Sequence, residues 1–330
     1  MKPSFLITTQ LLVSSCLLYF IFSAVPIGEI VEALAATNIQ LVVMAFVIEA
    51  VLRFVSAHQM RLVTDCQGMK VSSFGIFQVN LMASFYELFL PAYIAGGPIR
   101  WYQLSQQNKM RAEALAAIAF NRLINVFTLI LIGSACWMVD EQPRDSALKG
   151  WVLIGLLGLL ILLYASLVKS KILLFLSTYL RNERCPIIPH FLQNKVGKVT
   201  RALGQFQTLT LNAKLRIFGF STVQNLIGIL SIYLLAMSLA LPLSALTLAW
   251  IRSCVGILTM VPLSVAGLGI REGSLAVLLQ PYGVELQEAV ALSLLIFLMK
   301  IVWGTLGGIL EVGNLFVVSK RRAVPKQLPT

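Results

Sequence analysis

Long runs of apolar residues, separated by short connections that carry most of the charge, make up nearly the whole chain. A helix of about 20 apolar residues spans the hydrocarbon core of a bilayer. The run at 5–25 is long enough, and it lacks the cleavage site of a signal peptide, so it predicts an uncleaved first span. The pattern therefore predicts an all-α polytopic membrane protein. Further runs lie at 39–57, 73–95, 112–138, 151–168, 217–241, 246–262, 268–280 and 286–318.

The composition excludes a soluble enzyme and a disordered chain. Hydrophobic residues make up 58% of the chain and charged residues 12%, whereas soluble domains carry about 25% charged residues. The 26 Lys and Arg outnumber the 14 Asp and Glu, which gives a net charge of +12. In a membrane protein such a surplus indicates cytoplasmic loops, because basic connections stay inside. It does not indicate nucleic-acid binding.

The charges of the connections predict which side of the membrane each one faces. Acidic residues without a basic surplus place 26–38 and 139–150 outside. Basic residues place 57–72, 100–113 and 169–216 inside, and the last of these holds nine bases against one acid. The connections on both sides of 73–98 thus favour the cytoplasm, and a single crossing cannot satisfy both.

This conflict predicts that 73–98 enters from the cytoplasm, turns within the membrane and returns. The same reasoning applies to 246–282, because the turn at 242–245 lies outside and the basic tail lies inside. The expected architecture is about six transmembrane spans and two re-entrant hairpins. They form a single domain over 1–318, followed by a disordered basic tail at 319–330. Both termini are expected in the cytoplasm, and the protein in the cell inner (plasma) membrane.

The two expected hairpin turns have similar sequences. The segments Pro91–Arg100 and Pro262–Arg271 share Pro, Ala, Gly, Ile and Arg at five of ten aligned positions. The chain then consists of two halves, about 1–138 and 151–318, that begin on opposite sides of the membrane. Inverted repeats with broken segments near the midplane are typical of transporters. The alternative, in which Gly and Pro merely punctuate two surface loops, leaves the charge conflict unresolved.

The chemistry of these turns suits an anion. Irregular backbone at membrane depth survives only where protein or a water-filled cavity satisfies its polar groups. Glycine lets the chain bend and approach a ligand closely, and Pro98 lies where a helix would restart. Arg100 and Arg271 then fall in the first turn of each returning arm, beside free N–H groups that favour a phosphate. Interfacial snorkelling is the simpler alternative for each arginine. The glycines of the turns are Gly96, Gly97, Gly267 and Gly269.

These residues also resemble a known family. The stretch from Phe85 to Arg100, followed by Phe120-Asn121-Arg122, and the stretch from Val261 to Gly273 are similar to the flippase-like transmembrane domain of lysylphosphatidylglycerol synthases and their stand-alone relatives. The similarity covers about 5–318, and Gly-Leu-Gly-x-Arg-Glu-Gly is its most specific part. It implies translocation of a lipid with a charged headgroup, or of a lipid-linked precursor.

The chain departs from that family in two respects. No soluble aminoacyl-transferase domain is found after residue 318, so we expect a protein that is neither a lysyl-lipid synthase nor another enzyme. The first turn reads Ala92-Tyr93-Ile94-Ala95 where the family is more polar, so the headgroup stays open.

Several charged residues interrupt the apolar runs, where an ionisable group is costly and usually faces a cavity or a partner. Glu49 and Arg53 have the spacing of an intrahelical pair. Glu87 either pairs with Arg100 or carries a proton, and Glu272 beside Arg271 is a second candidate proton carrier. Further substrate-binding candidates are Arg122 and Lys300, and Lys300 has no carboxylate three or four positions away.

The basic loop 169–216 contains an amphipathic stripe from Leu192 to Leu209. Such a helix either lies on an anionic membrane face or docks against the spans of the protein itself. The five cysteines and two histidines form no ligand cluster, so we expect no metal and no cofactor.

The leading functional hypothesis is a flippase that moves an anionic-headgroup lipid by alternating access at the two hairpins. The alternatives are a secondary transporter of a small anionic solute and a non-catalytic partner of a cell-envelope lipid synthase. A membrane-embedded transferase is disfavoured, because no activated nucleophile or acidic metal motif is present. Expected partners are the lipid itself, with a homo-oligomer or an envelope-biosynthesis protein as further options, and no nucleic acid.

Overall fold

The computed structural model describes residues 27–89, 92–108, 110–140, 155, 158, 202–206, 209–260 and 267–323. Every regular element within these ranges is helical. Four of the helices are long and apolar enough to cross a membrane. They are α3 (Ile39–Asp65), α6 (Arg111–Val139), α10 (Leu211–Ser238) and α13 (Leu286–Ala323), of which Leu286–Gly313 forms the candidate span.

These helices confirm a multi-pass, all-α membrane protein. They coincide with four of the six spans that the apolar runs predict. The other two predicted spans, 5–25 and 151–168, lie outside the described residues apart from positions 155 and 158. Large apolar side chains are exposed along one side of α3, at Val43, Val47 and Val51, as expected for a surface that faces lipid rather than water.

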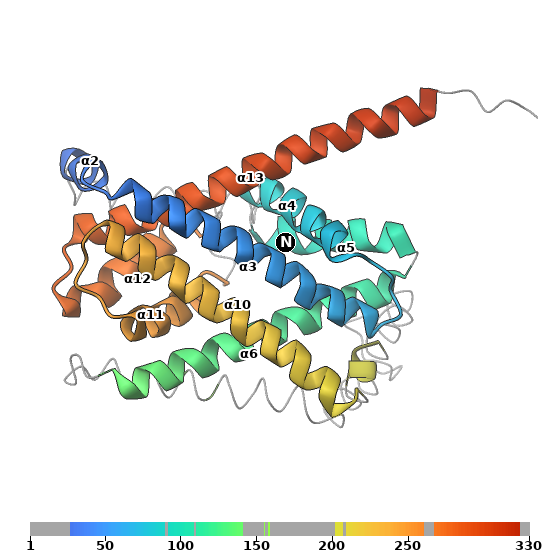
Figure 1. Ribbon diagram of the computed structural model, residues 1–330, viewed down its shortest axis with the longest axis horizontal. Helices are drawn as coiled ribbons and strands as arrows, with labels where there is room; N and C mark the ends of the chain where they lie inside the picture. Colours follow the sequence, from blue (N-terminus) through green and yellow to red (C-terminus); the bar gives the residue numbers. More distant parts are fainter. Residues whose placement is uncertain are drawn as a thin grey trace, which may run out of the picture.

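Two pairs of shorter helices accompany the four long ones. The first pair is α4 (Ser73–Phe89) and α5 (Ala92–Asn108), and the second is α11 (Ala245–Leu258) and α12 (Ile270–Leu279). Their lengths are 17, 17, 14 and 10 residues, all below the roughly 20 needed to span a bilayer. Within each pair the helices contact one another. The pairs lie at opposite ends of the bundle (Figure 1). They overlap the two segments of the chain that the sequence predicts to form hairpins.

The first turn differs from its prediction. Helix α5 begins at Ala92, so Gly96, Gly97 and Pro98 lie inside a helix, and Arg100 falls in its third turn. The connection to α4 is at residues 90–91, outside the described part of the chain. Backbone N–H and C=O groups in an apolar surrounding favour helix wherever they can bond internally. That requirement outweighs the cost of about 1 kcal/mol for glycine in a helix.

The second turn agrees with its prediction. Gly267 has φ +79° and Gly269 has φ +85°, values in the left-handed region that only glycine adopts without strain. Gly269 is the N-cap of α12, and Arg271 lies in the first turn of that helix.

Helices α2 (Ile27–Ala35) and η2 (Gln280–Tyr282) complete the described elements. Tyr282 takes part in a polar cluster that joins the second helix pair to α6. The Oδ2 atom of Asp140 accepts hydrogen bonds from Thr247 Oγ1 at 3.1 Å, Trp250 Nε1 at 3.0 Å and Tyr282 Oη at 3.0 Å. Burial, and then the charge of Asp140, raise the pKa of Tyr282, so the phenol remains a donor to this carboxylate.

The described end of the basic loop docks against the protein. Residues 202–205 are helical, Ala202 and Phe206 are buried, and the ring of Phe206 stacks on Phe120 at 3.9 Å between centroids. Gln67 Nε2 donates to the Ala202 carbonyl at 2.9 Å. For this described end of the amphipathic stripe, the explanation that holds is docking against the spans of the protein itself. Residues 169–201 lie outside the described residues.

Helix α13 approaches α4 very closely. Gly304, Gly307 and Gly308 face α4, and a Cβ atom at Gly307 would overlap the carbonyl oxygen of Leu81. Small residues at this spacing let two membrane helices touch backbone to backbone. The contact fixes the first helix pair on the last span of the chain.

Replacing Gly307 with alanine should lower stability, because the added methyl group overlaps rigid backbone and overpacking costs about 1–3 kcal/mol. Thermal unfolding of the purified protein in detergent should show a midpoint several degrees lower. Gly313→Ala, on the same helix with no atom within 4 Å of the new methyl group, is the matched control. Equal midpoints for the two variants would contradict this close approach.

Candidate functional site

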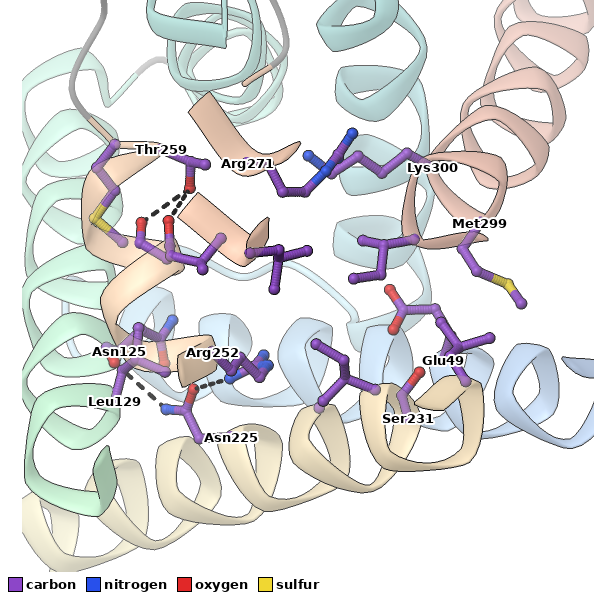
Figure 2. Close-up of a pocket in the computed structure, with 18 residues that line it drawn as sticks. Glu49, Asn125, Leu129, Asn225, Ser231, Arg252, Thr259, Arg271, Met299 and Lys300 are labelled. Carbon is purple, nitrogen blue, oxygen red and sulfur yellow. Dashed lines mark hydrogen bonds between the residues drawn. The ribbon is translucent and has the colours of Figure 1, made fainter. Parts of the chain in front are cut away.

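A cavity of about 400 Å³ lies between the long helices and the second helix pair (Figure 2). Its lining includes three basic side chains, Arg252 on α11, Arg271 on α12 and Lys300 on α13, and one acidic side chain, Glu49 on α3. We refer to it as the first cavity. Its other polar lining residues are Asn125, Asn225, Ser231 and Thr259.

Arg271 is held firmly at the edge of the first cavity. Its side chain is almost fully buried, with a residue exposure of 3%. Nε donates to Ser293 Oγ at 2.8 Å, Nη2 donates to Glu272 Oε1 at 2.6 Å, and the guanidinium lies 5.4 Å from the ring centroid of Phe297. Nη1 has no hydrogen-bond partner among the described residues. The guanidinium is therefore fixed on one side and retains a donor for a ligand.

Glu272 fixes both Arg271 and the glycine turn before it. Its Oε2 accepts the backbone N–H of Gly269 at 2.6 Å, and its Oε1 also accepts from Ser293 Oγ at 2.8 Å. These contacts give the carboxylate a structural role at the start of α12. Its predicted role as a proton carrier stays a prediction.

Arg252 lies within the apolar run 246–262 of the sequence, and in the structure it lines the first cavity. Its Nη1 donates to Asn225 Oδ1 at 3.2 Å. The guanidinium fits against α10 because Gly228 has no side chain, and a Cβ atom there would overlap it. Arg252 therefore depends on two residues of α10 for its position.

Asn225 continues into a polar network between α6 and α10 that the sequence analysis did not identify. Asn225 Nδ2 donates to Thr128 Oγ1 at 2.8 Å, the hydroxyls of Thr128 and Ser221 are 2.7 Å apart, and Ser221 donates to Asn125 Oδ1 at 2.6 Å. Polar residues three and four positions apart in each apolar helix are the sequence signal for such a network. Only the fold reveals that the two helices face each other.

A second cavity, of about 240 Å³, adjoins the first. Its basic lining residues are Arg53 on α3, Arg100 on α5 and Arg122 on α6, and it shares Glu49 and Asn125 with the first cavity. The two cavities thus meet at α3 and α6.

Arg100 is paired within the first helix pair. Its Nη2 lies 3.1 Å from Glu87 Oε1, and its Nε donates to Asn80 Oδ1 at 3.0 Å. This is one of the two alternatives predicted for Glu87. A Cβ atom at Gly96 would overlap the Glu87 carboxylate, so this glycine provides space for the ion pair rather than a turn.

The intrahelical pair predicted on α3 is present, with Arg53 Nη2 at 3.5 Å from Glu49 Oε1. Arg53 Nη1 also donates to Ser84 Oγ at 3.2 Å, and its guanidinium lies 5.0 Å from the ring centroid of Trp303. Arg53 Nε is buried and has no hydrogen-bond partner among the described residues.

The structure divides the predicted site residues between the two cavities. Arg271 and Lys300 line the first, whereas Arg100 and Arg122 line the second. Arg100 and Arg271 thus line different cavities, which share Glu49 on α3 and Asn125 on α6. The four glycines Gly96, Gly97, Gly267 and Gly269 are not among the lining residues of either cavity.

This architecture is that of an all-α membrane protein in which adjoining basic cavities lie between long spans and short helix pairs. The family model described as lysylphosphatidylglycerol synthase TM region matches residues 7–308, and the chain belongs to this family. The chain thus matches the transmembrane region of these synthases. No catalytic synthase domain is detected in it. No curated protein and no solved structure is detectably similar.

Replacing Ser293 with alanine should destabilise the protein, because it leaves Arg271 Nε and Glu272 Oε1 each short of a buried hydrogen bond. Unmade buried bonds cost about 1–3 kcal/mol, which should lower the thermal midpoint by several degrees. Ser274→Ala is the control, since that hydroxyl donates only to the Ile270 carbonyl of its own helix. Losses of similar size in both variants would rule out this anchoring role for Ser293.

Proposed function

We propose that the chain moves a lipid with an anionic headgroup across the membrane, with its two short helix pairs acting as opposed re-entrant hairpins. The observation that carries this proposal is the set of six basic side chains around two adjoining cavities between apolar spans. Charged groups in such a setting are costly and mark the path of a substrate or ion. Their excess over carboxylates selects an anion, and guanidinium groups suit phosphate oxygens. The family supports a lipid as the substrate.

The helix bounds support an inverted repeat. Arg100 and Arg271 are 171 positions apart. The same shift carries α3 from 39–65 to 210–236, beside α10 at Leu211–Ser238, and α4 from 73–89 to 244–260, beside α11 at Ala245–Leu258. It also carries the end of α5 to 279, where α12 ends. The shifted helix bounds named here agree with the observed ones within two residues, which favours two copies of one structural unit.

The packing supports the same symmetry. The short helix α4 packs on α13 of the other half, and α11 packs on α6 of the first half. A glycine permits each contact: Gly304 against Leu88, and Gly133 against Ser253. The two glycines are themselves 171 positions apart. Reciprocal contacts of this kind are expected where two halves rock against one another to alternate access.

In this mechanism the headgroup enters the cavities while its acyl chains stay in the bilayer. The sequence contains no phosphate-cradling nucleotide loop, so the driving force is a gradient of the lipid or of an ion. Glu87 and Glu272 are the proposed proton carriers, and the first is the more accessible of the two.

A secondary transporter of a small anionic solute is the second candidate. The specific observation in its favour is cavity size, because volumes of about 400 and 240 Å³ accommodate a small anion completely. The two candidates differ in whether acyl chains accompany the anion.

A liposome experiment tests lipid movement. We expect the wild-type protein to make a headgroup-labelled fluorescent phospholipid of the inner leaflet accessible to an external reductant. Arg100→Gln and Arg271→Gln should each slow this by about tenfold or more, because each removes a charge that meets the phosphate. Arg61→Gln, an exposed base that pairs with Asp65 and lines neither cavity, is the matched control.

Wild-type vesicles that are no faster than empty ones would contradict lipid translocation. Uptake of radiolabelled glycerol 3-phosphate by the same vesicles would then favour the small-solute transporter. Thermal unfolding of each variant separates a loss of transport from a loss of folding.

Cysteine labelling tests the hairpins in a variant whose native cysteines are replaced. Lys70→Cys and Arg111→Cys flank the first helix pair and are exposed, so both should react from the cytoplasmic side. Ala245→Cys and Glu285→Cys flank the second pair and should both react from outside. If the two members of either set react from opposite sides, that helix pair crosses the membrane and is not re-entrant.

A further inference from the structure

The two adjoining cavities differ in the chemistry of their walls. Nine of the twelve residues that line the second cavity are polar or charged, against eight of the eighteen that line the first. The apolar wall of the first cavity includes Leu129, Ile232 and Leu235, and it faces the basic side chains that suit a phosphate. A strongly hydrophilic part of a ligand is therefore better matched to the second cavity than to the first.

An unsatisfied acceptor in the second cavity indicates what this part of the ligand must supply. Asn121, on α6, lines the second cavity, and its Oδ1 atom is buried without a hydrogen-bond partner among the described residues. A buried amide oxygen without a partner costs free energy. A ligand that meets Asn121 must therefore donate a hydrogen bond, whereas the oxygens of an ionised phosphate only accept.

The charges around the second cavity disfavour a cationic donor. Arg53, Arg100 and Arg122 line this cavity, and the carboxylates paired there are Glu49 and Glu87. An ammonium group would thus enter beside an excess of positive charge, in a surrounding where like charges repel strongly. A neutral hydroxyl group meets both requirements, because it donates to an amide oxygen and accepts from a guanidinium.

The spacing of polar side chains indicates how far such a group extends. On α6, Asn125 lines both cavities and Asn121 lies about one helical turn away, in the second cavity. On α3, Glu49 lines both cavities and Ser56 lies about two turns away, again in the second cavity. One turn rises about 5.4 Å, which is comparable with the length of one sugar ring. A phosphate beside Asn125 can therefore carry a ring that reaches Asn121.

We propose that the second cavity is a subsite for an uncharged, hydroxyl-rich ring, a sugar or a cyclic polyol, that is linked to the phosphate of the substrate lipid. The phosphate lies in the first cavity at the free Nη1 of Arg271, and the ring lies in the second cavity against Asn121 and Ser56. The volume of about 240 Å³ accommodates one such ring. This inference rests on the proposed function for the lipid itself, but soluble phosphate esters test its chemistry.

The test is equilibrium binding of three radiolabelled esters to the purified full chain. Glucose 1-phosphate should bind on the order of tenfold more tightly than methyl phosphate, because its hydroxyls satisfy Asn121 and the neighbouring polar groups. Both are phosphate monoesters and differ only in the alcohol. Phosphorylethanolamine should bind no more tightly than methyl phosphate, because its ammonium group meets the guanidinium groups of the second cavity.

Substitutions in the second cavity locate the preference. Asn121→Leu replaces the amide with an apolar group of similar size. It should lower the affinity for glucose 1-phosphate to that for methyl phosphate and leave methyl phosphate binding unchanged. Ser56→Leu adds bulk to the same cavity, should have the same effect, and provides the test if Asn121→Leu fails to fold. Gln40→Leu is the matched control, because Gln40 is an exposed amide on α3 that lines neither cavity. It should retain the tenfold preference.

Equal binding of glucose 1-phosphate and methyl phosphate to the wild-type protein would overturn the subsite and indicate that water fills the second cavity. So would equal weakening of both esters in both subsite variants, tighter binding of phosphorylethanolamine than of methyl phosphate, or no binding of any ester. A wild-type protein that prefers glucose 1-phosphate but moves no lipid in liposomes contradicts the proposed function instead, and the subsite then still stands.

Discussion

The compensation of basic side chains inside an apolar bundle is the constraint on which the rest of this structure depends. Each cation costs free energy unless a carboxylate, an amide or a ligand meets it. Arg271 is met by Glu272 and Ser293, Arg100 by Glu87 and Asn80, and Arg252 by Asn225. Glu272 follows Arg271 on α12, whereas the other partners come from facing helices, so the charges and the helix packing stabilise one another.

The glycines of the bundle serve this same requirement. Gly96 and Gly228 provide space for a charged side chain, while Gly133, Gly304 and Gly307 let helices approach closely enough to enclose the cavities. Gly267 and Gly269 act instead through positive φ angles, at the turn that presents Arg271. The short helix pairs are thereby held between long spans, with their arginines turned toward the interior.

Much of the fold could be predicted from the sequence because hydropathy and charge act over segments. Four of the apolar runs correspond to the four long helices, and the two segments with conflicting connection charges contain short helices. The pair between Glu49 and Arg53 followed from helical spacing.

The site was harder to predict, because it depends on which helices face each other. Gly96 resembles a turn residue in the sequence but lies in a helix, and Arg100 and Arg271 match in the repeat yet line different cavities. The importance of Arg252 and Asn225 appears only once α10 and α11 are packed together.

The most direct test of this account is the position of a phosphate group in the protein. A cryo-electron microscopy structure of the full chain in phosphatidylglycerol nanodiscs should show headgroup density between Arg252, Lys300 and the free Nη1 of Arg271, with Glu49 turned to Arg53. Headgroups confined to the outer surface of the bundle, with no density in either cavity, would contradict the central claim that these basic cavities bind the translocated lipid.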